Sequence, residues 1–317
     1  MPLRFVAVAF DKNEIRATRY LAEGVQEARV TVRAELGVGV DAGLRGIRSA
    51  IRQVLPLNEG ITAVGVSAPG VMDHKRGVLR SLPGFPDWVD VPLQDVLVES
   101  LGVPVFVAEA ADTAVLGEWR FGVGRGVSDL IYIAVNDALD AGMIFQDQLF
   151  TGGNGMGGAI GRLLIECPLV APEAKVMTLE TLLSGETILE RARAHLAVGA
   201  SAALMEKLDG NLMALTVEIL CDAARQSDPM AQALLKDVGA CLGMALIHMM
   251  YLFDPALFVL DGMVQCAGDA LLGSMWQTIA ARTPAAYRDH ARIVLAQLGN
   301  DVRLWGALAL CLSELGL

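Results

Sequence analysis

Short apolar runs separated by polar turns predict strands through most of the first hundred residues. Residues 4–8 and 15–20 flank the polar turn Asp11-Lys12-Asn13, which is typical of a β-hairpin. Apolar residues at helical spacing predict an amphipathic helix over 43–55. The same reasoning predicts strands at 28–34, 61–66, 77–81 and 105–107, helices at 91–101 and 110–119, and a loop rich in Pro, Gly and Trp at 82–88.

A second hairpin and a glycine-dense loop occupy the middle of the chain. The apolar run 131–135, the polar turn 136–140 and the apolar run 142–145 precede a loop at 151–158, whose backbone can adopt φ > 0 and approach a ligand closely. After it we expect nearly continuous helices from 179 to 250, then a strand and turn at 254–262, a helix at 267–281, a strand at 293–295 and a helix at 301–312. Strand-rich beginnings followed by helices occur twice, which favours two α/β domains with a cleft between them.

Composition narrows the classes of function. The 317 residues carry a formal net charge of −11 without a Lys/Arg cluster, so we expect no direct nucleic-acid partner. The most apolar stretch, 238–260, is interrupted by His248, Tyr251 and Asp254, so we expect no membrane partner. The five cysteines lie far apart without a CxxC pair, and the N-terminus lacks a signal-peptide pattern. These features predict a cytoplasmic protein with reduced cysteines and no zinc site.

Several motifs occur in an order and spacing that match one known family. They are Gly65-Val-Ser-Ala-Pro-Gly70-Val-Met-Asp73, Leu116-Gly117-Glu118, Leu149-Phe-Thr-Gly-Gly-Asn-Gly155, Leu179-Glu-Thr-Leu-Leu-Ser-Gly185 and Asp254-Pro-Ala-Leu-Phe-Val-Leu260. With them the chain resembles, over essentially its whole length, the ROK family of sugar kinases and sugar-responsive repressors. The resemblance implies a two-domain α/β fold of the actin-like ATPase and sugar-kinase (ribonuclease H-like) type, with an interdomain cleft. Its domains would be residues 1–117, completed by the helix 301–317, and the larger residues 118–300.

The resemblance also locates the family's catalytic base, the Asp of a Glu-Asn-Asp triplet. An ungapped count back from Leu116-Gly117-Glu118 places it at Ala110, and alanine cannot accept a proton. Glu109 and Asp112 are the nearest carboxylates that could substitute. The alternative interpretation is that both are a solvated start of the helix, where the helix dipole favours acids. We therefore expect no catalytic residue of the family type.

The family's phosphate-binding loops differ in this chain. The first, Asp-x-Gly-Gly-Thr, corresponds to Ala9-Phe10-Asp11-Lys12-Asn13, without either glycine. In the second, only Gly142 remains, and Asp137 and Asp140 add negative charge that repels a triphosphate. Gly262 is the remnant at the adenosine end. Gly142 and Gly262 are thus the nucleotide-binding remnants, and a polar hairpin turn is favoured over a metal site at Asp137 and Asp140.

The sugar-contacting positions are partly retained. Glu180 matches the family, Ser81 is a change of residue type, and Asn154 lies in the retained glycine loop. Arg162 replaces the family's His and suits an anion better than a neutral sugar, although a surface or interdomain salt bridge explains it equally well. The family's cysteine-rich zinc loop is replaced by the short segment 167–175, so no zinc is expected. Ligand-binding candidates are therefore Ser81, Glu109, Asn154, Arg162 and Glu180.

Together these positions predict a pseudokinase, a non-catalytic ligand-binding or regulatory and assembly protein. No cofactor is expected, and the small-molecule partner would be sugar-like or anionic. The alternative is an ATP-dependent sugar or amino-sugar kinase, glucokinase-like with a rearranged site, and only this reading requires ATP and Mg²⁺. A family repressor would need a helix-turn-helix domain ahead of the first strand, which starts at about the fourth residue, so direct DNA binding is not expected. The family further implies a homodimer, with the helices of 212–250 as a candidate surface.

Overall fold

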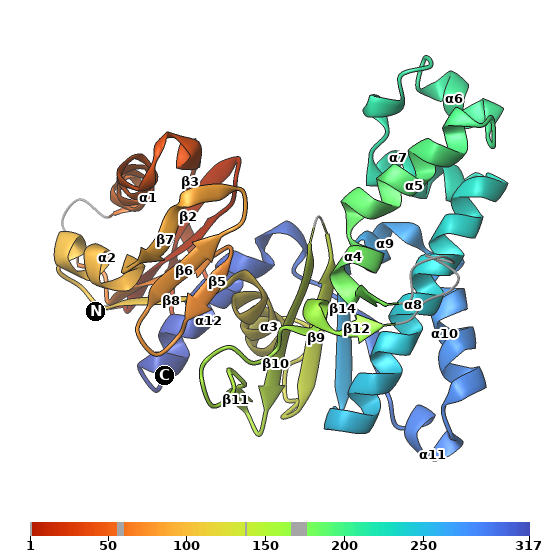
Figure 1. Cartoon of the computed structure of the whole chain (residues 1–317). Helices are drawn as coiled ribbons and strands as arrows, with labels where there is room; N and C mark the ends of the chain where they lie inside the picture. Colours follow the sequence, from red (N-terminus) through yellow and green to blue (C-terminus); the bar gives the residue numbers. More distant parts are fainter. Residues whose placement is uncertain (1, 56–59, 137, 166–175) are drawn as a thin grey trace. The chain divides into compact units, whose positions relative to one another are not determined.

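A computed structural model gives the structure of the chain and describes residues 2–55, 60–136, 138–165 and 176–317 (Figure 1). The chain forms two units. The first contains residues 1–128, 142–158 and 296–317, and the second contains 129–141 and 159–295. The domain boundaries expected from the sequence, 1–117 with 301–317 and 118–300, stay a prediction, because a compact unit need not be a domain that folds alone.

The first unit is built on a five-stranded sheet in the order β3-β2-β1-β4-β8. Strands β1 (Arg4–Phe10), β2 (Glu14–Leu21) and β3 (Gln26–Arg33) are antiparallel, which confirms the predicted hairpin. Strands β4 (Ala63–Ala68) and β8 (Val105–Glu109) continue the sheet parallel to β1. The carboxyl ends of β1, β4 and β8 therefore meet at one edge, where ligands bind in open α/β sheets.

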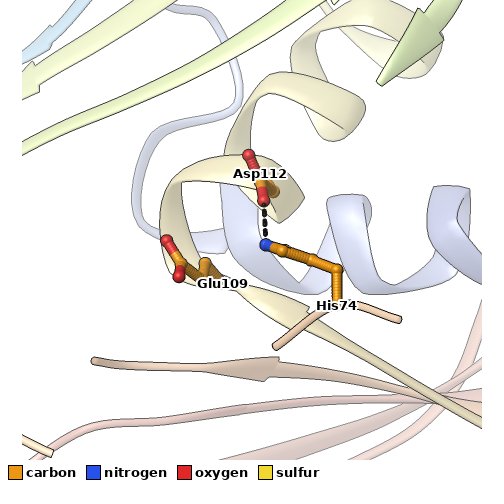
Figure 2. Close-up of side chains that lie close together, drawn as sticks. All are labelled: His74, Glu109 and Asp112. Atoms are coloured by element: carbon orange, nitrogen blue, oxygen red, sulfur yellow. Dashed lines mark ion pairs between the residues drawn. The ribbon is translucent and has the colours of Figure 1, made fainter. Parts of the chain in front are cut away.

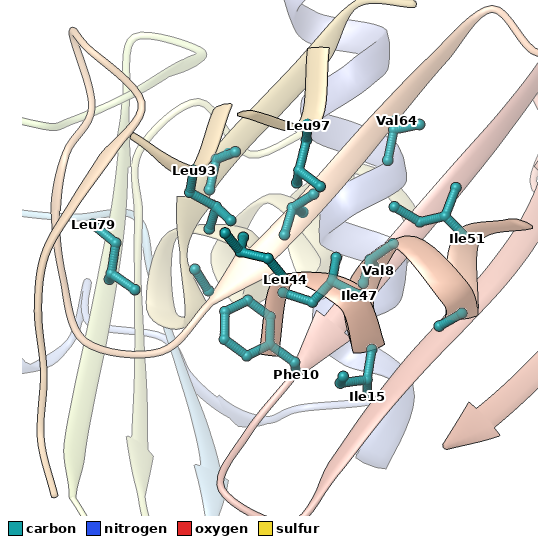
Figure 3. Packing of buried hydrophobic residues seen from close by; sticks show 14 of the residues in the cluster. Val8, Phe10, Ile15, Leu44, Ile47, Ile51, Val64, Leu79, Leu93 and Leu97 are labelled. Carbon is teal, nitrogen blue, oxygen red and sulfur yellow. The ribbon is translucent and has the colours of Figure 1, made fainter. Parts of the chain in front are cut away.

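Helices cover both faces of this sheet, so the run Phe5–Phe10 is apolar throughout. Val6, Val8 and Phe10 pack with α1 (Val40–Val54) and α2 (Leu93–Leu101), as Figure 3 shows for Val8 and Phe10. Phe5, Ala7 and Ala9 pack on the other face against α12 (Val302–Glu314). Helix α12 also contacts α3 (Ala110–Phe121).

A small sheet, β5-β6-β7, corrects two predictions. Residues 82–88 are not a loop, because β6 (Val78–Leu82) turns directly into β7 (Phe85–Val91); β5 spans Val71–Asp73. The helix expected from residue 91 begins at Leu93 instead. Pro86 is tolerated because β7 is an edge strand, and Trp88 anchors it by donating from Nε1 to the Leu36 carbonyl at 3.1 Å.

The second sheet has the order β11-β10-β9-β14-β15. Strand β14 (Leu257–Gly262) is parallel to β9 (Leu130–Val135) and to β15 (Ile293–Leu295). Strand β10 (Leu139–Phe145) neighbours β9, as the central pattern predicts, and pairs with the short β11 (Gln148–Leu149). A two-stranded ladder joins β12 (Leu164–Ile165) and β13 (Met177–Thr178).

Helices make up most of the remainder of the second unit and confirm the predicted helical region. They are α4 (Leu179–Leu183), α5 (Gly185–Ala197), α6 (Ala202–Lys207), α7 (Val217–Arg225), α8 (Pro229–Phe253), α9 (Met263–Ala267), α10 (Asp269–Arg282) and α11 (Ala285–Arg288). Helix α9 was not predicted, and Gly268 separates it from α10. Short 3₁₀ turns lie at Leu36–Val38, Ile160–Arg162, Leu212–Ala214 and Gly299–Asp301.

Helix α8 is the one helix in the described ranges that is long and apolar enough to cross a bilayer, and its most apolar 18-residue stretch has a mean hydropathy of 1.4. In its most apolar stretch, 72% is buried inside the protein, and a core helix passes the same test. Location in the cytoplasm stays a prediction. Cys221, Cys266 and Cys311 are free thiols, but Cys241 is disulfide-bonded, so the prediction of a reduced thiol is wrong there.

Candidate functional site

The candidate site of the first unit lies where β8 passes directly into α3. Glu109 is the last residue of β8, and Ala110 is the first residue of α3. The Thr113 hydroxyl contacts the carbonyl oxygens of Glu109 at 3.1 Å and Ala110 at 2.9 Å, and it lies 2.7 Å from the Ser67 hydroxyl at the end of β4. These buried contacts fix the position of the strand–helix junction.

Three side chains converge at this junction: His74, Glu109 and Asp112 (Figure 2). His74 Nε2 lies 3.0 Å from Asp112 Oδ2, and one donor atom from each of the three side chains lies within 4.8 Å of the others. Glu109 Oε1 accepts a hydrogen bond from the Met72 amide at 2.7 Å. Asp112 is buried, so it does not belong to a solvated helix start.

Burial and charge shift the proton affinities of the His74–Asp112 pair. Burial raises the pKa of the Asp112 carboxyl, and the opposing effect of His74 is smaller. Burial alone lowers the pKa of His74, but its hydrogen bond to Asp112 and the nearby charges of Asp112, Glu109 and Asp73 outweigh burial and raise it. Because the pKa of each side chain is raised, the pair favours a proton held between His74 and Asp112.

The glycine-dense loop lies beside His74. The Lys75 ammonium donates to the Gly153 carbonyl at 2.7 Å, and a side chain at Gly155 would come within 3.7 Å of the His74 amide nitrogen. Asn154 is exposed between these two contacts, whereas Ser81 is exposed on β6. Of the predicted ligand residues, the structure therefore brings Glu109 and Asn154 to the His74 segment.

The residues predicted to correspond to the first phosphate loop form a closed turn between β1 and β2. Asp11 Oδ1 accepts from the amides of Asn13 at 2.8 Å and Glu14 at 3.0 Å, and Asp11 Oδ2 lies 3.3 Å from Arg303. The Asp11 carboxylate thus accepts hydrogen bonds from two backbone amides of the loop. Burial by itself raises the pKa of the Asp11 carboxyl. The hydrogen bonds from the two amides and the charge of Arg303 outweigh burial and hold this pKa below its usual range.

Replacing Asp11 with alanine is expected to lower the free energy of unfolding at pH 7 by about 1–2 kcal/mol, since two amides lose a charged acceptor. A group with a depressed pKa stabilises the fold above its unfolded pKa and loses that contribution as pH falls through its folded pKa. The difference from wild type should therefore shrink below about pH 4. Urea unfolding at pH 7 and pH 3 measures it. Asn13→Ala, which keeps the backbone donor, is the control; equal loss in both variants would contradict the role of Asp11.

Gly142 and Gly262 each have a structural reason. A side chain at Gly142 would come within 2.4 Å of the Ala111 carbonyl oxygen in α3. Gly262 has φ +71°, and a side chain there would meet the Val135 carbonyl at 2.3 Å and Asn136 Oδ1 at 2.5 Å. Close backbone approach explains both glycines, and nucleotide binding by them stays a prediction.

The remaining candidates belong to the second unit. Arg162 and Glu180 are both exposed, and Glu180 Cβ lies 3.3 Å from where a side chain at Gly161 would begin. Among the residues that the structure describes, Arg162 has no ion-pair partner, so the salt-bridge alternative is not observed there. Asp137 and the segment 167–175 lie outside the described residues, and of Asp140 only the backbone, in β10, is described.

Comparison with known proteins agrees with this architecture. A family model described as "ROK family" matches residues 16–314. The chain belongs to the ROK family. Among its relatives, the glucokinase of Thermotoga maritima is 29% identical over 275 residues, covering 85% of this chain and 86% of that protein. The DNA-binding transcriptional repressor Mlc of Escherichia coli is 28% identical over 255 residues, and this ROK chain matches 60% of its length.

A solved structure supports the same fold. The ROK glucokinase of Streptomyces griseus, in complex with glucose and AMPPNP, superposes with a TM-score of 0.80 at 27% identity, covering 97% of this chain and 98% of that one. The predicted fold class, the α/β fold of the actin-like sugar kinases, is confirmed.

His74 is the site residue that sequence reasoning missed in this ROK protein. It directly follows Asp73, the end of the first family motif, and precedes the turn into β6. That position next to a motif was the available signal. Its pairing with Asp112 depends on how β5 lies against the start of α3, which the local pattern does not encode.

Proposed function

We propose that this chain is a ROK-family protein that binds a sugar-like ligand without transferring phosphate to it. The observation that carries the proposal is the start of α3. Ala110 stands where the family places its base, and the carboxylates on either side have other partners: Glu109 the Met72 amide and Asp112 His74. A general base must reach the proton that it removes, and alanine offers no acceptor.

The closed turn at Asp11 supports the same proposal. Phosphoryl transfer depends on backbone donors and metal ions that neutralise the phosphates. Here the Asp11 carboxylate takes two amide donors of the first loop and adds a negative charge. We therefore propose that ATP and Mg²⁺ are not required, and that the ligand contacts come from Ser81, Glu109, Asn154, Arg162 and Glu180. Arg162 favours a ligand that carries an anionic group.

An ATP-dependent sugar kinase is the second candidate. Similarity to the Thermotoga maritima glucokinase over 85% of this chain favours it. The His74–Asp112 pair also has the form of a base oriented by a carboxylate. In that case His74 would replace the family's aspartate.

Two measurements on the purified chain separate the candidates. An ADP-release assay with ATP–Mg²⁺ and glucose, mannose, N-acetylglucosamine or N-acetylmannosamine should give only the background without enzyme, with the Thermotoga maritima glucokinase as positive control. A thermal-shift screen of the same sugars, with sugar acids and sugar phosphates, should raise the melting temperature for at least one ligand. Asn154→Ala and Glu180→Gln should reduce that shift, and Glu99→Gln, an exposed acid of α2, should not.

Turnover above background that His74→Ala abolishes would establish the kinase instead. Silence across the whole ligand panel would refute sugar binding and leave an assembly role. Dimer formation, which the family implies, stays a proposal.

A further inference from the structure

We propose that His74, Glu109 and Asp112 bind one divalent transition-metal ion, of the Zn²⁺ and Co²⁺ class. The sequence predicted no metal, because these residues come from separate segments: the turn after β5, the end of β8 and the first turn of α3. The inference goes beyond sugar binding and does not depend on it.

Two of the three donor atoms already have the spacing that one ion requires, and the third lies close to them. Ligand atoms about 2.0–2.2 Å from the same Zn²⁺ lie roughly 3 Å or slightly more from one another. His74 Nε2 and Asp112 Oδ2 are 3.0 Å apart, and Glu109 contributes a third donor within 4.8 Å of both (Figure 2). On binding, the ion takes the place of the contact between His74 Nε2 and Asp112 Oδ2, and any proton on these two atoms is released to solvent.

Contacts around the three side chains hold them in place. The Met72 amide binds Glu109 Oε1 and so orients its carboxylate, as outer-shell hydrogen bonds do for metal ligands. Asp112 is buried, and its helix is fixed one residue later by the Thr113 and Ser67 hydroxyls. The backbone at Gly155 lies beside His74, where a side chain would come within 3.9 Å of His74 Cβ. These contacts hold the three side chains near one another in the absence of an ion.

The residue types indicate which ion fits. Imidazole nitrogen with carboxylate oxygen suits Zn²⁺ and Co²⁺, whereas Mg²⁺ prefers oxygen ligands alone. The third donor, Glu109, lies beside the His74–Asp112 ion pair at the carboxyl edge of the parallel strands. Three protein ligands leave a coordination position for water or for an oxygen of a bound molecule, as in zinc sites that act on ligands.

The test is metal titration of the full chain after treatment with a chelator, without any sugar present. Zn²⁺, followed by calorimetry, should bind at one equivalent and at least about 100-fold more tightly than Mg²⁺. His74→Ala and Glu109→Gln should each weaken Zn²⁺ binding by roughly 10–100-fold or more. His195→Ala, which removes an exposed histidine of α5, should bind as wild type.

Circular dichroism melting of each metal-free variant shows that the fold is intact, and Glu109→Gln preserves shape if His74→Ala does not fold. The Co²⁺ spectrum should lack a thiolate charge-transfer band. Such a band would place the ion at Cys221 and Cys266, whose sulfurs are 2.7 Å apart, and would overturn the proposal. Equal Zn²⁺ and Mg²⁺ affinities, or wild-type affinity in both ligand variants, would overturn it too. Sugar binding that persists without metal would leave the proposed function standing.

Discussion

Replacing Gly306 with alanine is expected to lower the free energy of unfolding by about 3–5 kcal/mol, or to prevent folding. Gly306 lies where α12 crosses α3, and a side chain there would come within 1.5 Å of the Thr113 carbonyl oxygen. Gly117, on the facing helix, would meet the Val302 carbonyl at 2.6 Å. Because the obstacles are backbone atoms, a rotamer change cannot relieve the clash, and the two helices must separate.

Chemical denaturation of Gly306→Ala against wild type measures this loss. Gly273→Ala is the matched control, because Gly273 lies inside the exposed face of α10 with nothing within 4 Å of a new side chain. That substitution should raise stability by about 0.5–1 kcal/mol through helix propensity. Near-neutral behaviour of Gly306→Ala would mean that the helices do not approach as closely as described.

Replacing Glu118 with alanine should cost about 3–5 kcal/mol. The side chain is fully buried in α3, and its two oxygens accept three backbone hydrogen bonds. Oε1 accepts from the amides of Gln297 and Leu298 at 2.8 Å each, and Oε2 accepts from Val123 at 3.0 Å. Alanine would leave these donors unsatisfied beside a cavity.

Glu118→Gln isolates the hydrogen bonds from the cavity. Its single carbonyl oxygen can serve Gln297 and Leu298, while its amide group would face the Val123 donor, so we expect an intermediate loss. Glu99→Ala, on the exposed side of α2, should change stability by less than about 0.5 kcal/mol. Equal midpoints for Glu118→Ala and Glu99→Ala would contradict this account.

Gly117 and Glu118 affect how the family motifs are interpreted. Leu116-Gly117-Glu118 is retained in this chain, and the structure gives Gly117 and Glu118 architectural roles in the first unit. Retention of the motif is therefore no argument that phosphate is transferred. The proposal that no phosphate is transferred depends instead on Ala110, its neighbours and the turn at Asp11.

Much of the fold could be predicted because buried strands and helices show short, recognisable patterns of apolar residues in the sequence. The apolar run at the first strand, the helical spacing of α1 and the hairpin at β9 and β10 all agree with the structure. Strand β7 could not be recognised, since Gly84 and Pro86 are typical of loops and its edge position, which tolerates proline, is a tertiary property.

The candidate site was harder to predict for the same kind of reason. Glu109 and Asp112 were identified by their distance from a motif, whereas His74 becomes visible only when β5 is placed beside the start of α3. Likewise, the Asp11 side chain looked like an obstacle to phosphate in the sequence, and only the folded turn shows it bound to the loop's own amides.

The place of α12 in the chain affects how the protein is synthesised. One face of the first sheet, with Phe5, Ala7 and Tyr20, is covered by side chains of the last helix, among them Leu304 and Leu308. On the ribosome, β1, β2 and β4 emerge long before residues 302–314 can cover that face. The second unit, residues 129–141 and 159–295, is by then fully synthesised. The first unit thus completes its core after the second unit, and its apolar sheet face stays open to chaperones until residues 302–314 have left the ribosome.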